Sequence, residues 1–288
     1  MTNPIVSVLM TSFNKEQFIA SAIDSVLASS HTDFELLIVD DGSTDQSVAI
    51  AKNYAAIDIR VHVYVNEINL GDYPNRNKAA SLAKGKYIKY VDADDHIYPW
   101  GLEILVQTME QFPEAGWGIC SLKPDPDRPY PFALNPAEIF EYQNYKASLF
   151  HNPPLSSIIK KDVFDAVQGF SGKRQMSDTE MWHLLALKYQ MVLMGQGIVW
   201  YRIYDGQEST QIRNDIAVRT RYAVAKYHFY QNNMLIPLAP EQRKSIASKM
   251  HRTMIKHIMI NLAKGKFRSA YTIYKLIPNH DYDFKALH

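Results

Sequence analysis

Cysteine is almost absent from this chain. One of its 288 residues, Cys120, is a cysteine, which excludes an internal disulfide framework and a zinc site built from several thiolates. Long apolar runs are also missing, because no segment approaches the roughly eighteen apolar residues that a membrane-spanning helix needs. The amino terminus lacks the basic segment, apolar core and cleavage site of a signal peptide, so we expect a cytoplasmic protein.

Acidic residues are scarce in the last quarter of the chain. Residues 1–210 hold 17 Lys/Arg against 26 Asp/Glu, whereas residues 211–288 hold 14 against 4. The net charge of +1 therefore hides two parts of different kinds. We expect a folded domain over residues 1–210 and a basic helical C-terminal extension over residues 211–288. No known nucleic-acid-binding motif accompanies the basic residues, so a nucleic-acid partner is not expected.

Short apolar runs alternate with helical periodicity through the first part of the chain. The predicted strands and helices alternate, in chain order, over residues 5–10, 19–27, 34–39, 46–55, 59–65, 75–83 and 86–91. This alternation predicts the α/β class, with a mostly parallel sheet flanked by helices. In such sheets ligands bind at the carboxyl ends of the strands.

Polar clusters follow three of the predicted strands, at residues 11–14, 40–43 and 92–95. Asp92 and Asp94 are two positions apart, so in an extended chain they point to the same side, and paired carboxylates suit Mg²⁺ or Mn²⁺. One alternative is a solvated, Asp-rich turn before the next helix. Another is a receiver-type signalling domain, which also carries acidic residues at a strand end. The placement alone leaves these alternatives open.

The second part of the domain has fewer regular signals. Four prolines within residues 123–131 predict a surface loop, which serves as a connector or as the edge of a cleft. The other predicted elements are strands at 116–121 and 156–159, and helices that begin near Pro99, Lys161 and Asp178.

Three segments together resemble the family 2 glycosyltransferases of the GT-A fold. They are residues 6–15, 34–45 and 85–95, which read VSVLMTSFNK, FELLIVDDGSTD and GKYIKYVDADD. The resemblance covers roughly residues 4–210. It implies a Rossmann-like GT-A domain with a nucleotide-sugar half at about 1–98 and an acceptor half at about 99–210. The implied activity is an inverting, metal-dependent transfer of a sugar from a nucleotide-diphosphate donor.

The resemblance also assigns residues to the donor site. Matched position by position, the implied nucleotide-binding residues are Thr11, Phe13, Asp40, Asp41, Arg76 and Asp92. The implied ligands of Mn²⁺ or Mg²⁺ are Asp94 and Asp92, with Asp95 behind them. An aromatic ring can stack on a base, a carboxylate can accept from a pyrimidine N–H, and a guanidinium can pair with phosphate, which favours a UDP-sugar.

The acceptor half offers a candidate general base. Gly169 and Phe170 resemble the family's acceptor-binding segment, and Asp178 resembles the catalytic carboxylate of an acidic pair. The family usually has Glu before this Asp, whereas Ser177 stands here. Asp178 as a plain helix N-cap is the alternative. A non-catalytic sugar-nucleotide-binding protein of the same fold is the alternative for the whole domain.

Two further departures from the family pattern affect the predicted activity. The Q-x-x-R-W motif is absent, which favours non-processive transfer to a glycan or lipid-linked acceptor. Tyr204 or Asp205 lies where many relatives carry a histidine that approaches the diphosphate.

The extension contains a helical pattern over residues 245–263. Apolar side chains recur every four residues from Ile246 to Leu262, and Lys249, Arg252 and Lys256 gather on another side. Three explanations stay open: a helix packed on the domain, peripheral contact with anionic lipid on the cytoplasmic membrane face, and charge attraction within or between the subunits of a homodimer.

Overall fold

The computed structural model describes residues 3–173, 176–204, 207 and 216–277. It divides into two compact units, the first made of residues 1–139 and 149–202 and the second of residues 140–148 and 203–288. The first unit confirms the predicted α/β class, with a mostly parallel sheet flanked by helices, and the second unit contains C-terminal helices. The predicted boundary near residue 210 lies outside the described residues. The division into donor and acceptor halves stays a prediction.

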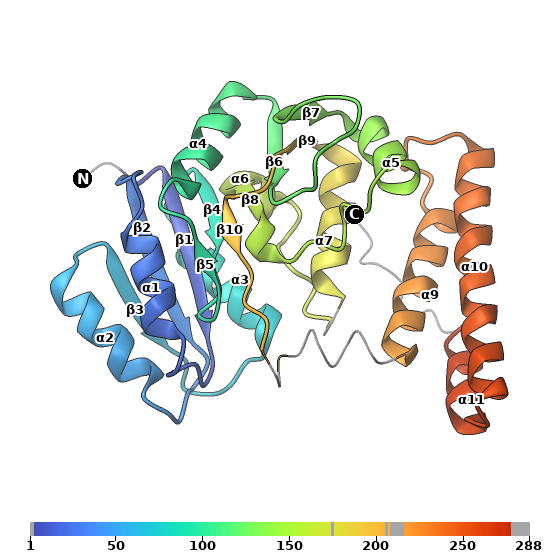
Figure 1. Cartoon of the computed structure of the whole chain (residues 1–288), viewed down its shortest axis with the longest axis horizontal. Coiled ribbons are helices and arrows are strands. Elements are labelled where there is room, and N and C mark those ends of the chain that lie inside the picture. Colours follow the sequence, from blue (N-terminus) through green and yellow to red (C-terminus); the bar gives the residue numbers. More distant parts are fainter. Residues whose placement is uncertain (1–2, 174–175, 205–206, 208–215, 278–288) are drawn as a thin grey trace. The chain divides into compact units, whose positions relative to one another are not determined.

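An eight-stranded sheet forms the centre of the first unit (Figure 1). Its strands are β1 (Val6–Ser12), β2 (Phe34–Asp40), β3 (Val61–Val65), β4 (Tyr87–Tyr90), β6 (Ala115–Ile119), β7 (Phe132–Leu134), β8 (Ser157–Lys160) and β9 (Gln190–Leu193). Their order is β3-β2-β1-β4-β8-β6-β9-β7. Strands β1 to β4 are parallel, as are β6 and β9, whereas β8 is antiparallel to β4 and β6, and β7 is antiparallel to β9. A small second sheet pairs β5 (His96–Ile97) with β10 (Val199–Trp200).

Helices cover both faces of the sheet. They are α1 (Ile19–Leu27), α2 (Ser47–Ile57), α3 (Asp72–Leu82), α4 (Gly101–Gln111), α6 (Lys161–Ala166) and α7 (Ser177–Lys188), with a short 3₁₀ turn at Pro154–Ser156. A further helix, α5 (Pro136–Tyr145), begins in the first unit and ends in the second. In the sheet, β2 lies beside β1 and β3 lies beyond β2, whereas β4 lies on the other side of β1. Right-handed crossovers therefore place α1 and α2 on one face and α3 on the other.

The strands of the first unit carry apolar side chains on both faces, and these side chains form its core. Every residue of β2 is buried, as expected for a parallel strand covered on both faces. Beyond β8, Trp117 on β6 stacks on Trp182 of α7 with ring centroids 5.5 Å apart, and both side chains are fully buried. This packing fixes α7 against the second half of the sheet.

The strand order reverses between β1 and β4. Their registered pairs run from Val6 with Tyr87 to Leu9 with Tyr90, so the loops that follow the two strands leave the sheet side by side. Such a switch point opens a crevice at the carboxyl ends of the strands. The residues that follow β1 and β4 are the polar clusters that the sequence singled out.

Helix α3 begins three residues earlier than predicted, at Asp72 instead of Asn75. Pro74 suggests a helix breaker, but the first turn of a helix tolerates proline because its N–H groups have no partner within the helix. Gly71 precedes the helix with a φ of 89°, which favours glycine. The earlier start places Asp72 one turn before Arg76.

The second unit contains three consecutive helices, α9 (Ile216–Asn232), α10 (Pro240–Ala263) and α11 (Phe267–Leu276) (Figure 1). Val224 of α9, Met254 of α10 and Ile273 of α11 are fully buried. Helix α10 starts before the predicted residue 245 because Pro240 suits the first helical position. No helix among the described residues is both long and apolar enough to cross a membrane.

Candidate active site

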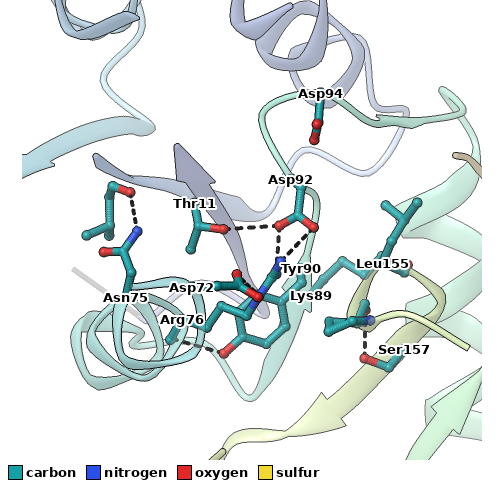
Figure 2. Close-up of polar contacts among 12 residues, drawn as sticks. Thr11, Asp72, Asn75, Arg76, Lys89, Tyr90, Asp92, Asp94, Leu155 and Ser157 are labelled. Atoms are coloured by element: carbon teal, nitrogen blue, oxygen red, sulfur yellow. Dashed lines mark hydrogen bonds and ion pairs between the residues drawn. The ribbon is translucent and has the colours of Figure 1, made fainter. Parts of the chain in front are cut away.

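Arg76 lies between two carboxylates at the carboxyl end of the parallel strands (Figure 2). Its Nη1 and Nη2 donate to the two carboxylate oxygens of Asp92 at 2.7 and 2.9 Å, and its Nε donates to Asp72 Oδ1 at 2.8 Å. The backbone carbonyl of Arg76 accepts from the Tyr90 hydroxyl at 3.1 Å. The forked pair fixes the direction of the guanidinium, as planar Arg–carboxylate pairs do.

The Asp92 carboxylate is held in its charged form. Burial alone would raise its pKa, but the charge and hydrogen bonds of Arg76, together with the Thr11 hydroxyl, outweigh burial and lower the pKa below the usual range. The Thr11 hydroxyl donates to Asp92 Oδ1 at 3.1 Å. The end of β1 is thereby linked to the loop after β4.

Asp94 pairs with a lysine that follows β1. Lys15 Nζ lies 2.6 Å from Asp94 Oδ2, and the Asp94 side chain is 11% exposed. Behind this pair, burial and the neighbouring Asp92 raise the pKa of Asp95 to about 8, although the backbone N–H of Arg202 donates to its Oδ1 at 2.9 Å. Asp92 and Asp94 thus face cations, whereas Asp95, with a pKa of about 8, is largely protonated at neutral pH.

These carboxylates determine whether a divalent cation fits the site. Among the described residues, no group of three or more His, Cys, Asp or Glu side chains is arranged to hold a metal. Asp92 is engaged on both oxygens by Arg76, whereas Asp94 reaches the site from a loop and carries a displaceable ammonium. Asp94 therefore fits as a single protein ligand for Mg²⁺ or Mn²⁺, of the kind that shares its cation with substrate phosphates and water.

The predicted nucleoside pocket divides into exposed and internally bonded residues. Phe13 is 47% exposed, so its ring is available for stacking. The Asp41 carboxylate is buried and accepts from Asn66 Nδ2 at 2.7 Å and from the backbone N–H groups of Leu70 and Gly71 at 2.8 Å each. Both oxygens of Asp41 thus organise the loop before α3. Their predicted contact with a base stays a prediction.

Asp40 organises the turn after β2. Its Oδ1 accepts from the Ser43 backbone N–H at 2.7 Å, and its Oδ2 accepts from the Ser43 hydroxyl at 2.6 Å. These bonds to a residue three positions further on stabilise the turn and give Asp40 a structural role of its own. The implied nucleotide contact of Asp40 is a prediction that these bonds do not require.

Asp178 lies in the first turn of α7, after the helix N-cap residue Met176. Its side chain is partly exposed, and its Oδ1 accepts from the Thr179 N–H at 2.6 Å. Burial raises the pKa of Asp178 to about 6, although the Thr179 N–H and the charge of Arg76 act to lower it. The charges of Arg76 and Asp72 also act on this pKa, so Asp178 lies near the forked pair. A carboxylate with a pKa near 6 is charged at neutral pH and can accept a proton.

Gly169 and Phe170 form a tightly packed corner beside this site. The backbone N–H of Phe170 donates to Asn77 Oδ1 at 2.9 Å, and Asn77 Nδ2 donates back to the Phe170 carbonyl at 2.8 Å. The Phe170 ring is 3% exposed and packs against Tyr73 with centroids 5.2 Å apart. The ring therefore supports α3 from within the protein, and the predicted acceptor contact of this segment stays a prediction.

Several residues of the site were not singled out from the sequence. They are Lys15, Asp72, Asn77, Lys89 and Arg202. The spacing of Asp72 and Arg76 was a usable signal, because residues four apart on a helix are neighbours. Arg202 and Lys15 reach the site through long-range contacts, for which one sequence offers no signal. Of the two residues predicted near the diphosphate, Tyr204 belongs to the second unit, and Asp205 lies outside the described residues.

Lys89 is a fully buried lysine directly behind the acidic cluster (Figure 2). Its ammonium donates to the Leu155 carbonyl. Burial lowers its pKa from 10.5 to about 8, although the charges of Cys120, Asp92 and Asp95 act in the opposite direction. A cation in the interior at this point helps to balance the charge of Asp92.

The comparison with known families identifies this class of protein. A family model described as Glycosyl transferase family 2 matches residues 7–177. This chain belongs to glycosyl transferase family 2, and its fold is the GT-A fold predicted from the three segments.

Two curated sequences illustrate the range of relatives. TuaG of Bacillus subtilis, which carries the provisional name of a teichuronic acid biosynthesis glycosyltransferase, is 44% identical over 97 residues, covering 33% of this chain and 38% of TuaG. The glycosyltransferase GlyG of Streptococcus pneumoniae is 26% identical over 220 residues, covering 70% of this chain and 72% of GlyG. The chain thus matches well under half of the length of TuaG.

Two solved structures share the fold at low sequence identity. TarS of S. aureus, residues 1–349 in complex with UDP-GlcNAc, superposes with a TM-score of 0.68 at 16% identity, covering 95% of this chain and 81% of that one. A mannosyltransferase from Pyrobaculum calidifontis, in complex with GDP-Man and Mn²⁺, gives a TM-score of 0.62 at 14% identity, covering 96% and 75%.

Proposed function

We propose that this protein is a non-processive, inverting glycosyltransferase that moves a sugar from a nucleoside-diphosphate donor to a hydroxyl of a glycan or lipid-linked acceptor. The observation that carries the proposal is the Asp72–Arg76–Asp92 cluster beside Lys15–Asp94, at the point where strand order reverses. It combines fixed cations for a diphosphate with a carboxylate for a metal. Family membership favours this proposal over a receiver-type domain.

Each group has a defined task in this proposal. Arg76 and Lys15 bind the diphosphate oxygens and stabilise the charge that grows on the leaving group. Asp178 accepts the proton of the acceptor hydroxyl while that oxygen attacks the anomeric carbon from the side opposite the diphosphate, so one displacement inverts the configuration. Asp94, with Asp92 behind it, would hold Mn²⁺ or Mg²⁺, which supplies Lewis-acid neutralisation of the diphosphate when bound.

A UDP-sugar is the proposed donor. The exposed ring of Phe13 suits stacking on a base, and TarS, a protein of the same fold, has been solved with UDP-GlcNAc. The neighbour that binds GDP-Man makes GDP-sugars the first comparison. The test is a panel of UDP- and GDP-sugars with and without Mn²⁺, read out as a thermal shift and as release of nucleoside diphosphate. If none of these nucleotide sugars raises the unfolding temperature, the protein does not have this function.

Asp178→Asn tests the proton acceptor. We expect kcat to fall by about 10²–10⁴-fold, the usual contribution of a positioned base, with donor binding retained. In the unchanged protein kcat/KM should rise with pH through about 6, because the pKa of Asp178 is raised to about 6 and its charged form is the active one.

Asp162→Asn is the matched control. Asp162 also lies in the first turn of a helix and accepts the next residue's N–H, at 2.8 Å, but it is exposed on α6. Full transfer activity in Asp178→Asn would contradict the base assignment. Donor binding without transfer in the unchanged protein, for every acceptor tried, would favour the non-catalytic alternative.

A further inference from the structure

Helices α10 and α11 each carry a row of apolar side chains that the second unit leaves in solvent. The spacing is the same on both helices, with members four and then three residues apart, which is the spacing of one helix face. The exposed fractions run from 41% at Leu262 to 69% at Phe267. These exposed apolar rows consist of Ile255, Met259 and Leu262 on α10, and Phe267, Tyr271 and Tyr274 on α11.

The exposed apolar rows are separate from the faces that make the core of the unit. Met254 and His257 of α10 are buried, as are Ala270 and Ile273 of α11. Each helix thus has a second apolar side opposite or beside its packed side. A surface helix of a globular protein usually keeps that side polar, so contiguous exposed apolar residues point to a contact surface.

Basic residues surround both rows. Residues 242–277 contain nine Lys/Arg and no Asp/Glu. All nine lie on or between the two helices and eight of them are exposed, and the Lys275 ammonium sits 4.8 Å from the centre of the Tyr271 ring. The exposed ones are Lys244, Lys249, Arg252, Lys256, Lys264, Lys266, Arg268 and Lys275.

We propose that the exposed face of α10 and α11 docks on an anionic lipid surface. The basic side chains would pair with lipid phosphates while the apolar rows enter the boundary between headgroups and acyl chains, which is how interfacial helices bind. A second copy of this face is a poor occupant, because two uniformly basic surfaces repel each other. A nucleic acid would satisfy the charges and leave six large apolar side chains in water.

The docking goes beyond sugar transfer and does not depend on it. The test is sedimentation of the full chain with vesicles of phosphatidylcholine alone or with about 30% phosphatidylglycerol, in low and high salt. We expect binding to the anionic vesicles at about 50 mM salt, at least about tenfold weaker binding at about 500 mM salt, and little binding to neutral vesicles.

Two sets of variants separate the apolar and basic contributions. Phe267→Ser/Tyr271→Ser/Tyr274→Ser and Lys264→Gln/Lys266→Gln/Arg268→Gln should each weaken vesicle binding at least about tenfold. The matched apolar control is Met234→Ser/Leu235→Ser, which are 76% and 64% exposed outside both rows. The matched charge control is Lys52→Gln/Lys84→Gln/Lys123→Gln, three exposed lysines of the first unit. Both controls should bind within about twofold of the unchanged chain.

Circular dichroism and thermal unfolding establish that each variant is folded. The proposal is overturned by absence of vesicle binding at low salt, by equal binding to neutral vesicles, or by unchanged binding in both triple variants. It is also overturned if the chain is a dimer that the aromatic variant converts to monomer, while vesicles never bind, because the rows would then be a protein interface. Asp94→Asn, a donor-site variant, should bind vesicles as the unchanged chain does.

Discussion

Arg76 is shielded from water while it joins two carboxylates, so its loss should affect stability as well as activity. Its side chain is 9% exposed and that of Asp92 is 18% exposed. Arg76→Met leaves Asp92 charged, largely buried and without its main partner, which typically costs about 3–5 kcal/mol of unfolding free energy. Urea unfolding measures this loss, and titration with UDP should show at least about tenfold weaker binding.

Arg60→Met is the matched control for this prediction. Arg60 also donates two hydrogen bonds to a carboxylate, that of Asp58, but the two side chains are 28% and 24% exposed. We expect Arg60→Met to cost at most about 1 kcal/mol and to leave UDP binding unchanged. Equal losses in the two variants would show that the Arg76 fork contributes no more than a surface ion pair.

Lys89 should make the stability of the protein depend on alkaline pH. Its pKa is about 8 in the folded protein and 10.5 in the reference state, so between these values the unfolded chain binds the additional proton. Stability contributed by this group therefore rises with pH across the window from about 8 to 10.5, by up to about 1.4 kcal/mol per pH unit. The charged ammonium destabilises the fold below that window.

The measurement is a comparison with Lys89→Met, which keeps the length of the side chain and removes its charge. Urea unfolding at several values of pH should show the unchanged chain gaining on Lys89→Met as the pH rises above about 8. A constant difference between the two proteins from pH 7 to 10 would mean that Lys89 does not change its protonation in this range.

At the scale of elements, the turn between α6 and α7 is held against α3 at Gly169. This glycine has a φ of 63°, and a Cβ built on it would lie 2.6 Å from Asn77 Oδ1, the atom that accepts from Phe170. Gly169→Ala should therefore lose both the favourable backbone conformation and the Asn77 contact. We expect a cost in unfolding free energy of about 1–3 kcal/mol above that of the backbone effect alone.

Gly172→Ala isolates the backbone effect. Gly172 has a φ of 79° and no atom within 4 Å of a built Cβ, so only the left-handed conformation is penalised, by about 1–2 kcal/mol. Both variants are compared by urea unfolding and by donor titration. If the two costs are equal, Asn77 moves aside at no measurable expense and does not define the position of this turn.

The elements that sequence patterns predicted correctly are those in which pattern and burial agree. The strand predicted at 34–39 is β2, whose residues are all buried, and the alternation of strands and helices led to the correct sheet. The predicted start of α3 was wrong because proline disfavours the interior of a helix, whereas Pro74 lies in the first turn, where proline is tolerated. The boundary of a helix depends on the preferences of one or two residues. The type of an element is indicated by a pattern that extends over all its residues.

The contacts between residues of the site could not be predicted from the sequence for a different reason. The sequence pointed to Asp92, Asp94, Arg76 and Asp178 as candidates, but the same residues can pair with ligands or with one another. Lys15 is 79 positions from Asp94, and Arg202 is 107 positions from Asp95. One sequence contains no information on such pairs. Whether these residues act as assigned stays a prediction for the experiments above.

At the scale of the whole molecule, the two units should unfold in separable transitions. Each has its own buried methionine, Met191 in β9 and Met254 in α10, and both side chains are fully buried. Met191→Ala should destabilise the first unit and Met254→Ala the second, each by about 2–5 kcal/mol. Differential scanning calorimetry checks this prediction. UDP and Mn²⁺ should raise the transition temperature of the first unit alone. One transition that shifts as a whole in both variants would show a single cooperative body.

The C-terminal extension shows how far an amphipathic pattern can be interpreted. The predicted apolar row from Ile246 to Leu262 includes the buried Ile246 and Met254, but Leu262 is exposed. The exposed row on the same helix, which shares Leu262 with the predicted row, also has helical spacing, and sequence periodicity cannot say which of the two rows faces the core. The contacts with α9 and α11 make that choice.

The Lys15–Asp94 pair has a consequence for the order of ligand loading. A free divalent cation that approaches Asp94 competes with an ammonium tethered to the same chain, whose effective concentration is far above that of the metal in solution. A cation chelated by the donor brings a polyanion that offers Lys15 a replacement partner. We therefore expect the metal to bind together with the donor as a chelate, whereas the metal alone should saturate the protein poorly.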